Sequence, residues 1–303
     1  MLQTALATEN QARVRSPFLA TARPRQWIKN VLVFAAPAAA GAMLRPATLA
    51  ATGLALAAFI LASVSTYFIN DAADVHADRA HPVKSRRPVA AGLISPRRAR
   101  LSGLAVAAAA LLLAAAVNLP FAGCVAGYLA LTVTYSSVLK NIAVLDVLAV
   151  AGGFVLRAAG GAAATRVPMS NWFLLTTLLG ALYLVTAKRL GEHSRELRRP
   201  PHWTGRTVLA SYSGPWLQQI LTMTLTGTVL AYAGWAFGYR GRDIAMPLLA
   251  ISFVPFLAGL MRYSLLVSRG DGEVPENLLT GDRFLLLAGV LWSGTAAAAV
   301  YLG

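Results

Sequence analysis

Nine apolar stretches, each close to the length of a bilayer crossing, dominate this 303-residue chain. A membrane-spanning helix needs about 20 predominantly apolar residues. Hydrophobic residues make up 57% of the chain and charged residues only 13%, which is far from the balance of a soluble globular domain. The pattern predicts an all-α integral membrane protein with nine transmembrane helices, at about residues 27–44, 48–70, 100–118, 120–138, 142–162, 170–187, 212–238, 244–267 and 283–302.

The basic residues predict how these helices are oriented. Most of the 27 Lys and Arg residues fall in alternate segments, starting with the one before the first helix. Cytoplasmic loops of membrane proteins are enriched in Lys and Arg, so these segments are expected inside the cell. The opposite side holds only Arg45, Arg166, Arg240 and Arg242. We therefore expect a multi-pass protein of the cell inner (plasma) membrane with its N-terminus inside and its C-terminus outside.

Other features of the composition exclude some classes of function. The formal net charge of +15 is explained by the loop bias, and no basic helix with base-reading neighbours is visible, so we expect no nucleic acid partner. The single cysteine, Cys124, excludes an internal disulfide and a Cys-based metal site. Residues 1–22 lack the apolar core of a signal peptide and are predicted to be a cytoplasmic tail. Residues 23–303 are predicted to be one transmembrane catalytic domain.

The strongest chemical signal is the segment NDAADVHAD. Asn70, Asp74 and Asp78 are spaced four residues apart, so on a continuous helix they line one face, with Asp71 at its edge. Oxygen ligands suit Mg²⁺, which usually shares its shell with substrate phosphates. A solvated helix end is the alternative, but carboxylates on one face repel each other unless a cation screens them. The motif predicts a catalytic Mg²⁺ site with Asn70, Asp74 and Asp78 as the metal ligands.

Basic residues follow this acidic segment directly, in HPVKSRRP. Lys84, Arg86 and Arg87 are either ordinary cytoplasmic loop cations or contacts to substrate phosphate. Their position beside the acidic residues favours phosphate contact, and acid and base side by side predict a diphosphate site. Arg87-Pro88 and the nearby Gly92 predict a turn that folds the segment back over the helix ends.

Two further segments combine a helix end with charged side chains. RPRQWIKN places Arg25 and Lys29 four residues apart at the start of the first helix, where they either bind phosphate or extend to the membrane surface. AKRLGEH, after the sixth helix, repeats the acid-plus-base pattern in reduced form with Lys188, Arg189 and Glu192. Both segments are predicted to contribute substrate-binding side chains.

Charged residues also lie inside the fifth predicted helix. Asp146 and Arg157 are eleven residues apart, close to three helical turns, so they share a face that is expected to point into the bundle. Charges at membrane depth are costly and tend to line cavities, so we favour a cavity wall that contacts substrate over a structural contact between helices. Gly153 and Gly160 lie near the same face and allow close approach of another helix.

Together these motifs resemble those of the UbiA superfamily of intramembrane prenyltransferases. The shared patterns are RPxxxxKN, NDxxDxxxD, HPxKxxRP and DxxxxxxxxxxRxxxG, and the resemblance runs from about Arg23 to the last helix. It implies a nine-helix bundle with cytoplasmic cap loops. Within the superfamily the chain is most similar to the decaprenyl-phosphate phosphoribosyltransferases, on the segments RPRQWIKNVLVFAAP, FINDAADVHADRAHPVKSRRPVAAG, FVLRAAGGAAA, PMSNWFLL and AKRLGEH.

The resemblance implies a reaction. A 5-phosphoribosyl group passes from phosphoribosyl diphosphate to polyprenyl (decaprenyl) phosphate with release of diphosphate, in an Mg²⁺-dependent step of cell-wall arabinan (arabinogalactan) precursor synthesis. The active site is expected to face the cytoplasm, and the acceptor phosphate is expected to meet Arg157 or Lys140. The 5-phosphate is bound by cations drawn from Lys29, Lys84, Arg86, Lys188 and Arg189.

One departure from the superfamily pattern bears on the substrate. Typical members carry a second aspartate-rich motif after the sixth helix, whereas this chain has Lys188-Arg189 followed by Glu192 and Glu196. Fewer carboxylates and more cations fit a donor with an extra phosphate, as phosphoribosyl diphosphate has.

Two other functions remain open from the sequence. An ordinary prenyltransferase, moving a polyprenyl group from its diphosphate to an aromatic acceptor, would share the fold and metal site. A transporter would use Asp146 and Arg157 in a substrate path but would leave the NDAADVHAD cluster without a role. Exposed faces of small residues also permit a homo-oligomer.

Overall fold

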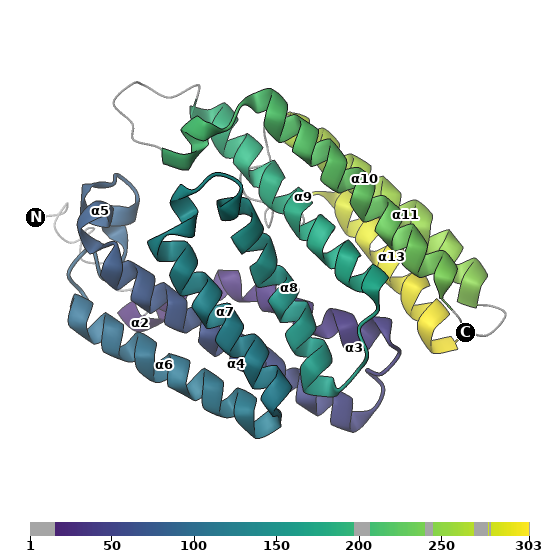
Figure 1. The fold of residues 1–303 in the computed structure, drawn as a ribbon, viewed down its shortest axis with the longest axis horizontal. Coiled ribbons are helices and arrows are strands. Elements are labelled where there is room, and N and C mark those ends of the chain that lie inside the picture. The colour runs from purple at the N-terminus through teal and green to yellow at the C-terminus, as the bar shows by residue number, and fades with distance from the viewer. Residues whose placement is uncertain (1–15, 197–206, 240–244, 270–277, 279, 303) are drawn as a thin grey trace, which may run out of the picture.

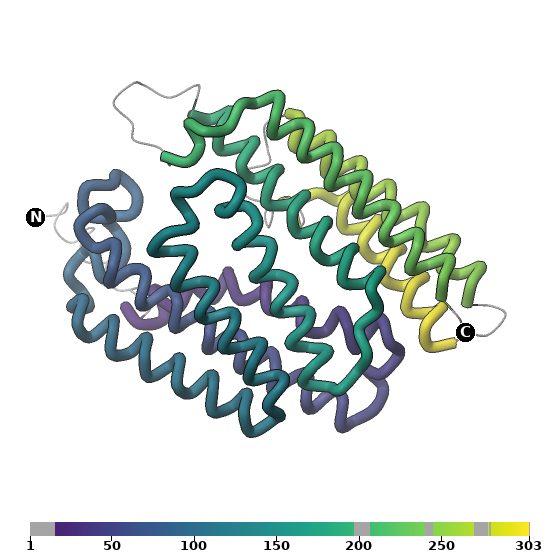
Figure 2. Tube along the Cα trace, viewed as in Figure 1, coloured from purple at the N-terminus to yellow at the C-terminus, as the bar shows by residue number. Residues whose placement is uncertain are grey.

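The structure is a computed structural model that describes residues 16–196, 207–239, 245–269, 278 and 280–302. Every regular element in these ranges is helical (Figures 1 and 2). In chain order they are α2 (Pro17–Ala22), η1 (Pro24–Phe34), α3 (Ala35–Ala39), α4 (Pro46–Ala73), α5 (Val75–Ala80), η2 (Lys84–Arg86), α6 (Pro96–Val117), α7 (Leu119–Ser137), η3 (Leu139–Asn141), α8 (Leu145–Thr165), α9 (Asn171–Glu196), η4 (Thr207–Ser211), α10 (Gly214–Gly238), α11 (Ala245–Ser268) and α13 (Arg283–Leu302).

Eight helices in the described ranges are long and apolar enough to cross a membrane, namely α4, α6, α7, α8, α9, α10, α11 and α13. They match eight of the nine predicted spans, so the prediction of a helical, multi-pass membrane protein is confirmed. Helix α8 is the most enclosed of the eight, with 56% of its apolar window buried. This agrees with its having the least lipid-like sequence.

The first predicted span, 27–44, was wrong as a single long helix. The chain forms the 3-10 helix η1 and then the short helix α3, and Gly41, with a φ of +67°, follows it. Pro37 is one cause, because proline lacks an N–H and its ring clashes with the carbonyl four residues earlier, that of Val33. The described residues therefore show eight candidate spans, with η1 packed against α4 and α8 and α3 packed against α8.

Close packing of η1 on α8 depends on glycine. A Cβ on Gly161 would lie 2.7 Å from the carbonyl carbon of Val33 and would clash with its oxygen. A Cβ on Gly160 would lie 2.8 Å from the ring of Phe59 on α4. The expectation that the glycines of this helix admit close neighbours is confirmed.

The helix connections divide between two ends of the bundle. In Figure 1 α5, the α7–α8 turn, the end of α9 and the start of α10 lie at the upper left, while the α6–α7 and α8–α9 connections lie at the other end. The turns η3 and η4 contact each other. The end of the bundle that holds α5, η3 and η4 therefore gathers the acidic and basic segments that the sequence analysis identified.

The predicted tail, residues 1–22, lies outside the described residues up to position 15. Its remainder forms α2, which packs on α4 and places the ring of Phe18 5.9 Å from that of Phe68. The domain boundary at residue 22 stays a prediction.

Candidate active site

Three carboxylates mark the junction of α4 and α5. Helix α4 ends at Ala73, and Asp74 caps it with φ −89° and ψ 10° before α5 begins. The expected continuous helix through Asn70, Asp74 and Asp78 is therefore interrupted at Asp74, although the Asp74 N–H still donates to the Asn70 carbonyl and the Asp78 N–H to the Asp74 carbonyl, each at 2.8 Å. Asp71 and Asp78 are each 2% exposed, whereas the side chain of Asp74 is 41% exposed.

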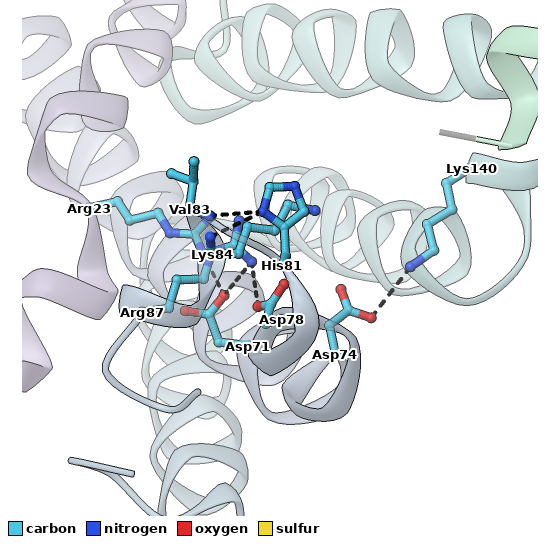
Figure 3. Close-up of polar contacts among 9 residues, drawn as sticks. All are labelled: Arg23, Asp71, Asp74, Asp78, His81, Val83, Lys84, Arg87 and Lys140. Atoms are coloured by element: carbon cyan, nitrogen blue, oxygen red, sulfur yellow. Dashed lines mark hydrogen bonds and ion pairs between the residues drawn. The ribbon is translucent and has the colours of Figure 1, made fainter. Parts of the chain in front are cut away.

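Arginine side chains engage the two buried carboxylates (Figure 3). Arg87 Nη1 lies 2.7 Å from Asp78 Oδ2 and 3.3 Å from Asp71 Oδ1. Arg23 Nη2 forms a second ion pair with Asp71 Oδ1. The predicted turn after Arg87 is confirmed, since Gly92 adopts a φ of +81° and the segment folds back onto α5 through the hydrogen bond from Arg79 Nε to the Ala90 carbonyl, 3.1 Å.

Asp74 takes its cation from a different element. Lys140, on η3, places Nζ 3.5 Å from Asp74 Oδ1. Figure 3 shows the Asp74 carboxylate directed toward Lys140 and away from the arginines. Each of the three carboxylates thus has a cationic partner, and the partners come from the α2–η1 junction, the segment after η2, and η3.

The donor set fits Mg²⁺ by its chemistry. Asn70, Asp74 and Asp78 offer hard oxygen ligands, and Asp71 Oδ2 is buried without a hydrogen-bond partner. Their present arrangement is not a finished metal site, because no group of three His, Cys, Asp or Glu side chains in the described chain converges on one point. Arg87 lies between two of the carboxylates instead.

A second charged cluster joins α8 to α9. Arg189 is 2% exposed; its Nε lies 2.7 Å from Asp146 Oδ2, and its Nη1 lies 2.7 Å from Glu192 Oε2. Lys188 Nζ lies 3.9 Å from Glu192 Oε1. The structure therefore brings together four of the predicted substrate-binding residues, and Tyr135 adds a contact of 3.4 Å to Arg189.

Tyr212 connects this cluster to the segment after η4. Its hydroxyl donates to Asp146 Oδ1 and accepts from the Val144 N–H at 2.7 Å. Burial, together with the Asp146 hydrogen bond, raises the pKa of Tyr212 to about 12. The neutral phenol is thus the favoured form, and it ties the α9–α10 connection to the start of α8.

Arg157 is enclosed in a third, interior cluster. Its Nε donates to Asn30 Oδ1 at 2.7 Å, its Nη1 to the Gly153 carbonyl at 2.9 Å, and its Nη2 to the Tyr128 hydroxyl at 2.8 Å. The guanidinium also lies over the Tyr128 ring, 4.5 Å from its centroid. Arg157 and Asp146 are both buried in the bundle, as expected, and Arg157 makes hydrogen bonds to η1 and α7. Its role in a cavity wall that contacts substrate stays a prediction.

The other predicted cations are more open. Arg25, Lys84 and Arg86 are exposed and Lys29 is half-buried, so none of the four is enclosed by protein. The sequence analysis did not predict Arg23 as a site residue, although Arg23 is the first residue of the RPRQWIKN segment that also contains Arg25. It also missed Tyr212, for which the sequence carries no local signal, because its partner Asp146 is 66 positions away.

The chain is similar to known proteins over most of its length. Residues 31–288 match the UbiA prenyltransferase family. A decaprenyl-phosphate phosphoribosyltransferase of Mycolicibacterium smegmatis is 38% identical over 94% of this chain and 93% of that protein. Another of that name, from Mycobacterium tuberculosis, is 35% identical over 98% of this chain and 99% of its own length.

Solved structures share the fold at lower identity. A UbiA homolog from Archaeoglobus fulgidus bound to GPP and Mg²⁺ has a TM-score of 0.70 at 22% identity, and the match covers 94% of this chain and 99% of that one. A digeranylgeranylglyceryl phosphate synthase has a TM-score of 0.65 at 14% identity, with coverage of 95% and 98%.

Proposed function

The chain belongs to the UbiA prenyltransferase family, and on this basis we propose that it transfers a 5-phosphoribosyl group from phosphoribosyl diphosphate to decaprenyl phosphate, releasing diphosphate. Near full-length similarity to proteins named decaprenyl-phosphate phosphoribosyltransferase supports the choice of reaction. The observation that carries the site is the pairing of Asp71, Asp74 and Asp78 with Arg23, Arg87 and Lys140 at one end of the bundle, where Arg87 bridges Asp71 and Asp78.

Asn70, Asp74 and Asp78 are the residues that would hold Mg²⁺. A bound Mg²⁺ supplies charge stabilisation to the leaving diphosphate. Asp78 is released for this role when Arg87 moves from the carboxylate to a phosphate oxygen, where guanidinium forms strong, often bidentate hydrogen bonds. The pairs in the structure thus keep these side chains neutralised until an anionic substrate arrives.

The remaining cations orient the substrates. Lys84 and Arg86, both exposed beside the acidic junction, bind phosphates of the donor. Lys140 sits across from Asp74 and meets the acceptor phosphate. That phosphate is an anion at neutral pH, so its oxygen attacks the ribose C1 without a general base while the bond from C1 to the diphosphate breaks.

The setting of the reaction follows from charge and length. The basic loops support a site at the cytoplasmic face of the plasma membrane, with the N-terminus inside. The segment formed by η1 and α3 lies where the first span was expected; η1 packs on α4 and α8 and α3 packs on α8, and neither has the length of a full crossing. The lipid product serves as a precursor of cell-wall arabinan.

Purified full-length protein with two alternative donors tests this proposal. With Mg²⁺, labelled phosphoribosyl diphosphate and decaprenyl phosphate, we expect equal amounts of diphosphate and lipid-linked phosphoribose. Labelled prenyl diphosphate with an aromatic acceptor should remain unreacted. Consumption of the prenyl donor and not of the phosphoribosyl donor would assign the chain to ordinary prenyl transfer.

A further inference from the structure

An apolar groove runs along the lipid-facing side of the bundle, apart from the charged clusters. It has a volume of about 630 Å³ and lies between α2, α4 and α6. Its walls include Phe18 and Leu19 of α2, Val64 and Phe68 of α4, and Val106 of α6. Exposed leucines on α6, Leu101 and Leu104, flank it and mark this side as one that faces lipid.

Unpaired positive charge lies at one end of the groove. Ser102 lines the groove, and Arg98 lies four residues before it on α6, so the two share a helix face. Arg98 is exposed, and its guanidinium has no ion-pair or hydrogen-bond partner within the described chain; Arg97 and Arg100 beside it are exposed as well. An apolar channel with free guanidinium groups at its end complements a lipid with an anionic headgroup.

We propose that this groove binds one anionic phospholipid of the bilayer, with an acyl chain between α2, α4 and α6 and its phosphate at Arg98. The acceptor substrate is the less suitable occupant because of the geometry of α4. Val64 and Phe68 line the groove, whereas Ser63 faces the interior, where its hydroxyl lies 3.3 Å from that of Tyr128. Asn70 is seven residues after Ser63 and so shares the interior face, away from the groove.

The bound lipid also supports the active site. Helix α2 forms one wall of the groove, and Arg23 follows it directly with a φ of 52°. Arg23 then pairs with Asp71, three residues after Phe68 on α4. A lipid acyl chain that fills the groove holds α2 in place, and with it Arg23. The bound lipid therefore favours the form of the acidic junction in which Arg23 is paired with Asp71.

Photolabelling of the full-length protein in phosphatidylcholine vesicles tests the site directly. The probe is phosphatidylglycerol with a diazirine in its acyl chain, and labelled peptides are identified by mass spectrometry. We expect the label on α2 and on α6 near Val106. Arg98→Gln should weaken this labelling about fivefold, since one cation near an anionic lipid headgroup contributes on the order of 1 kcal/mol. Arg45→Gln, the same change at the exposed far end of α4, should leave labelling unchanged.

A matched pair of tryptophan variants tests the groove itself. Ala105→Trp fills the groove and should abolish the label, whereas Leu104→Trp, on the exposed flank, should not. Equal labelling by a phosphatidylcholine probe, or no effect of Arg98→Gln, would overturn the proposal. Displacement of the label by decaprenyl phosphate but not by unlabelled phosphatidylglycerol would also overturn it, in favour of the acceptor. These readouts need no turnover, so they stand apart from the test of the reaction.

Discussion

At the scale of single residues, the acidic junction is defined by charge matching. Arg87 bridges the buried Asp71 and Asp78, and Lys140 neutralises the more exposed Asp74. Buried carboxylates without partners would be strongly unfavourable, so these ion pairs compensate the buried negative charge of Asp71 and Asp78. A divalent cation must then compete with Arg87, and a diphosphate relieves that competition by giving the guanidinium another anion. We therefore expect metal and diphosphate to strengthen each other's binding.

Arg87→Gln tests this competition without any turnover. The variant removes one positive charge beside the Asp71 and Asp78 carboxylates. Mn²⁺ should therefore bind on the order of tenfold more tightly in the absence of diphosphate, as measured by electron paramagnetic resonance. Added inorganic diphosphate should then increase Mn²⁺ affinity less than in the parent protein. Arg100→Gln removes an exposed cation that has no partner among the described residues; it is the control and should change neither value. Unchanged or weaker Mn²⁺ binding by Arg87→Gln would contradict the counter-ion role.

Arg157→Met distinguishes a structural role from contact with the lipid phosphate. The variant removes hydrogen bonds to Asn30 and Tyr128 and leaves buried polar atoms unsatisfied, each at a cost of about 1–3 kcal/mol. We expect a melting temperature in detergent several degrees lower than that of the parent protein. Arg157→Lys should restore it only in part, because an ammonium group lacks the planar set of N–H donors of the guanidinium. An unchanged melting temperature with a raised KM for decaprenyl phosphate would instead support substrate contact.

Residue types and residue pairings differ in how far sequence predicts them. The spacing of acids and bases identified Asp78, Arg87, Arg189 and Glu192, and the structure brings these into two clusters. The partners were not predictable, because Arg23 and Asp71 are 48 positions apart and only the packing of α2 on α4 brings them together.

At the scale of elements, prolines and glycines decide where the chain departs from regular helices. Hydropathy predicted a first span, but it does not register Pro37, which lies within α3 and lacks a backbone N–H. It also treats NDAADVHAD as one helix, whereas α4 ends at Ala73 and α5 begins at Val75. The eight long helices were predictable because each contains an apolar stretch close to the length that a transmembrane helix needs.

Gly161→Ala tests the close approach of η1 to α8. The added methyl group meets the Val33 backbone, which cannot move aside as a side chain would, so we expect a loss of about 1–3 kcal/mol in stability. Gly294→Ala on α13 is the matched control, since nothing lies within 4 Å of its Cβ position. Alanine is the better helix former, so this control should be neutral or slightly stabilising. Equal melting temperatures for the two variants would contradict the packing described here.

Asp282 gives an element-scale prediction that depends on pH. It accepts from the Leu285 N–H at 3.0 Å at the start of α13 and pairs with Arg262 Nη2 at 2.8 Å. The hydrogen bond from Arg262 is the main cause that lowers the pKa of Asp282 below 3.8. A lowered folded-state pKa adds stability above the unfolded value, and this is lost as pH falls through the folded value. Asp282→Asn should therefore melt earlier than the parent protein near pH 7, and the difference should shrink below about pH 4; a gap independent of pH would count against the ion pair.

At the scale of the whole molecule, the bundle serves to bring distant segments to one end. The connection through α5, the turn η3 and the segment around η4 come from three separate helix pairs and meet there (Figure 1). The alternation of basic loops predicted which connections share an end of the bundle. The fold class was thus predictable from hydropathy, and charge indicated the end at which the acidic and basic segments gather. The three-dimensional ion pairs were not, because they depend on how the helices pack.

The rate of phosphoribosyl transfer to decaprenyl phosphate, measured with and without a chelator of divalent cations, tests the central claim most directly. We expect the rate to fall to background in chelator, to return with added Mg²⁺, and to stay at background when Asp74 and Asp78 are both replaced by alanine. Undiminished transfer in chelator, or from the double variant, would contradict a metal-assisted diphosphate site at the α4–α5 junction.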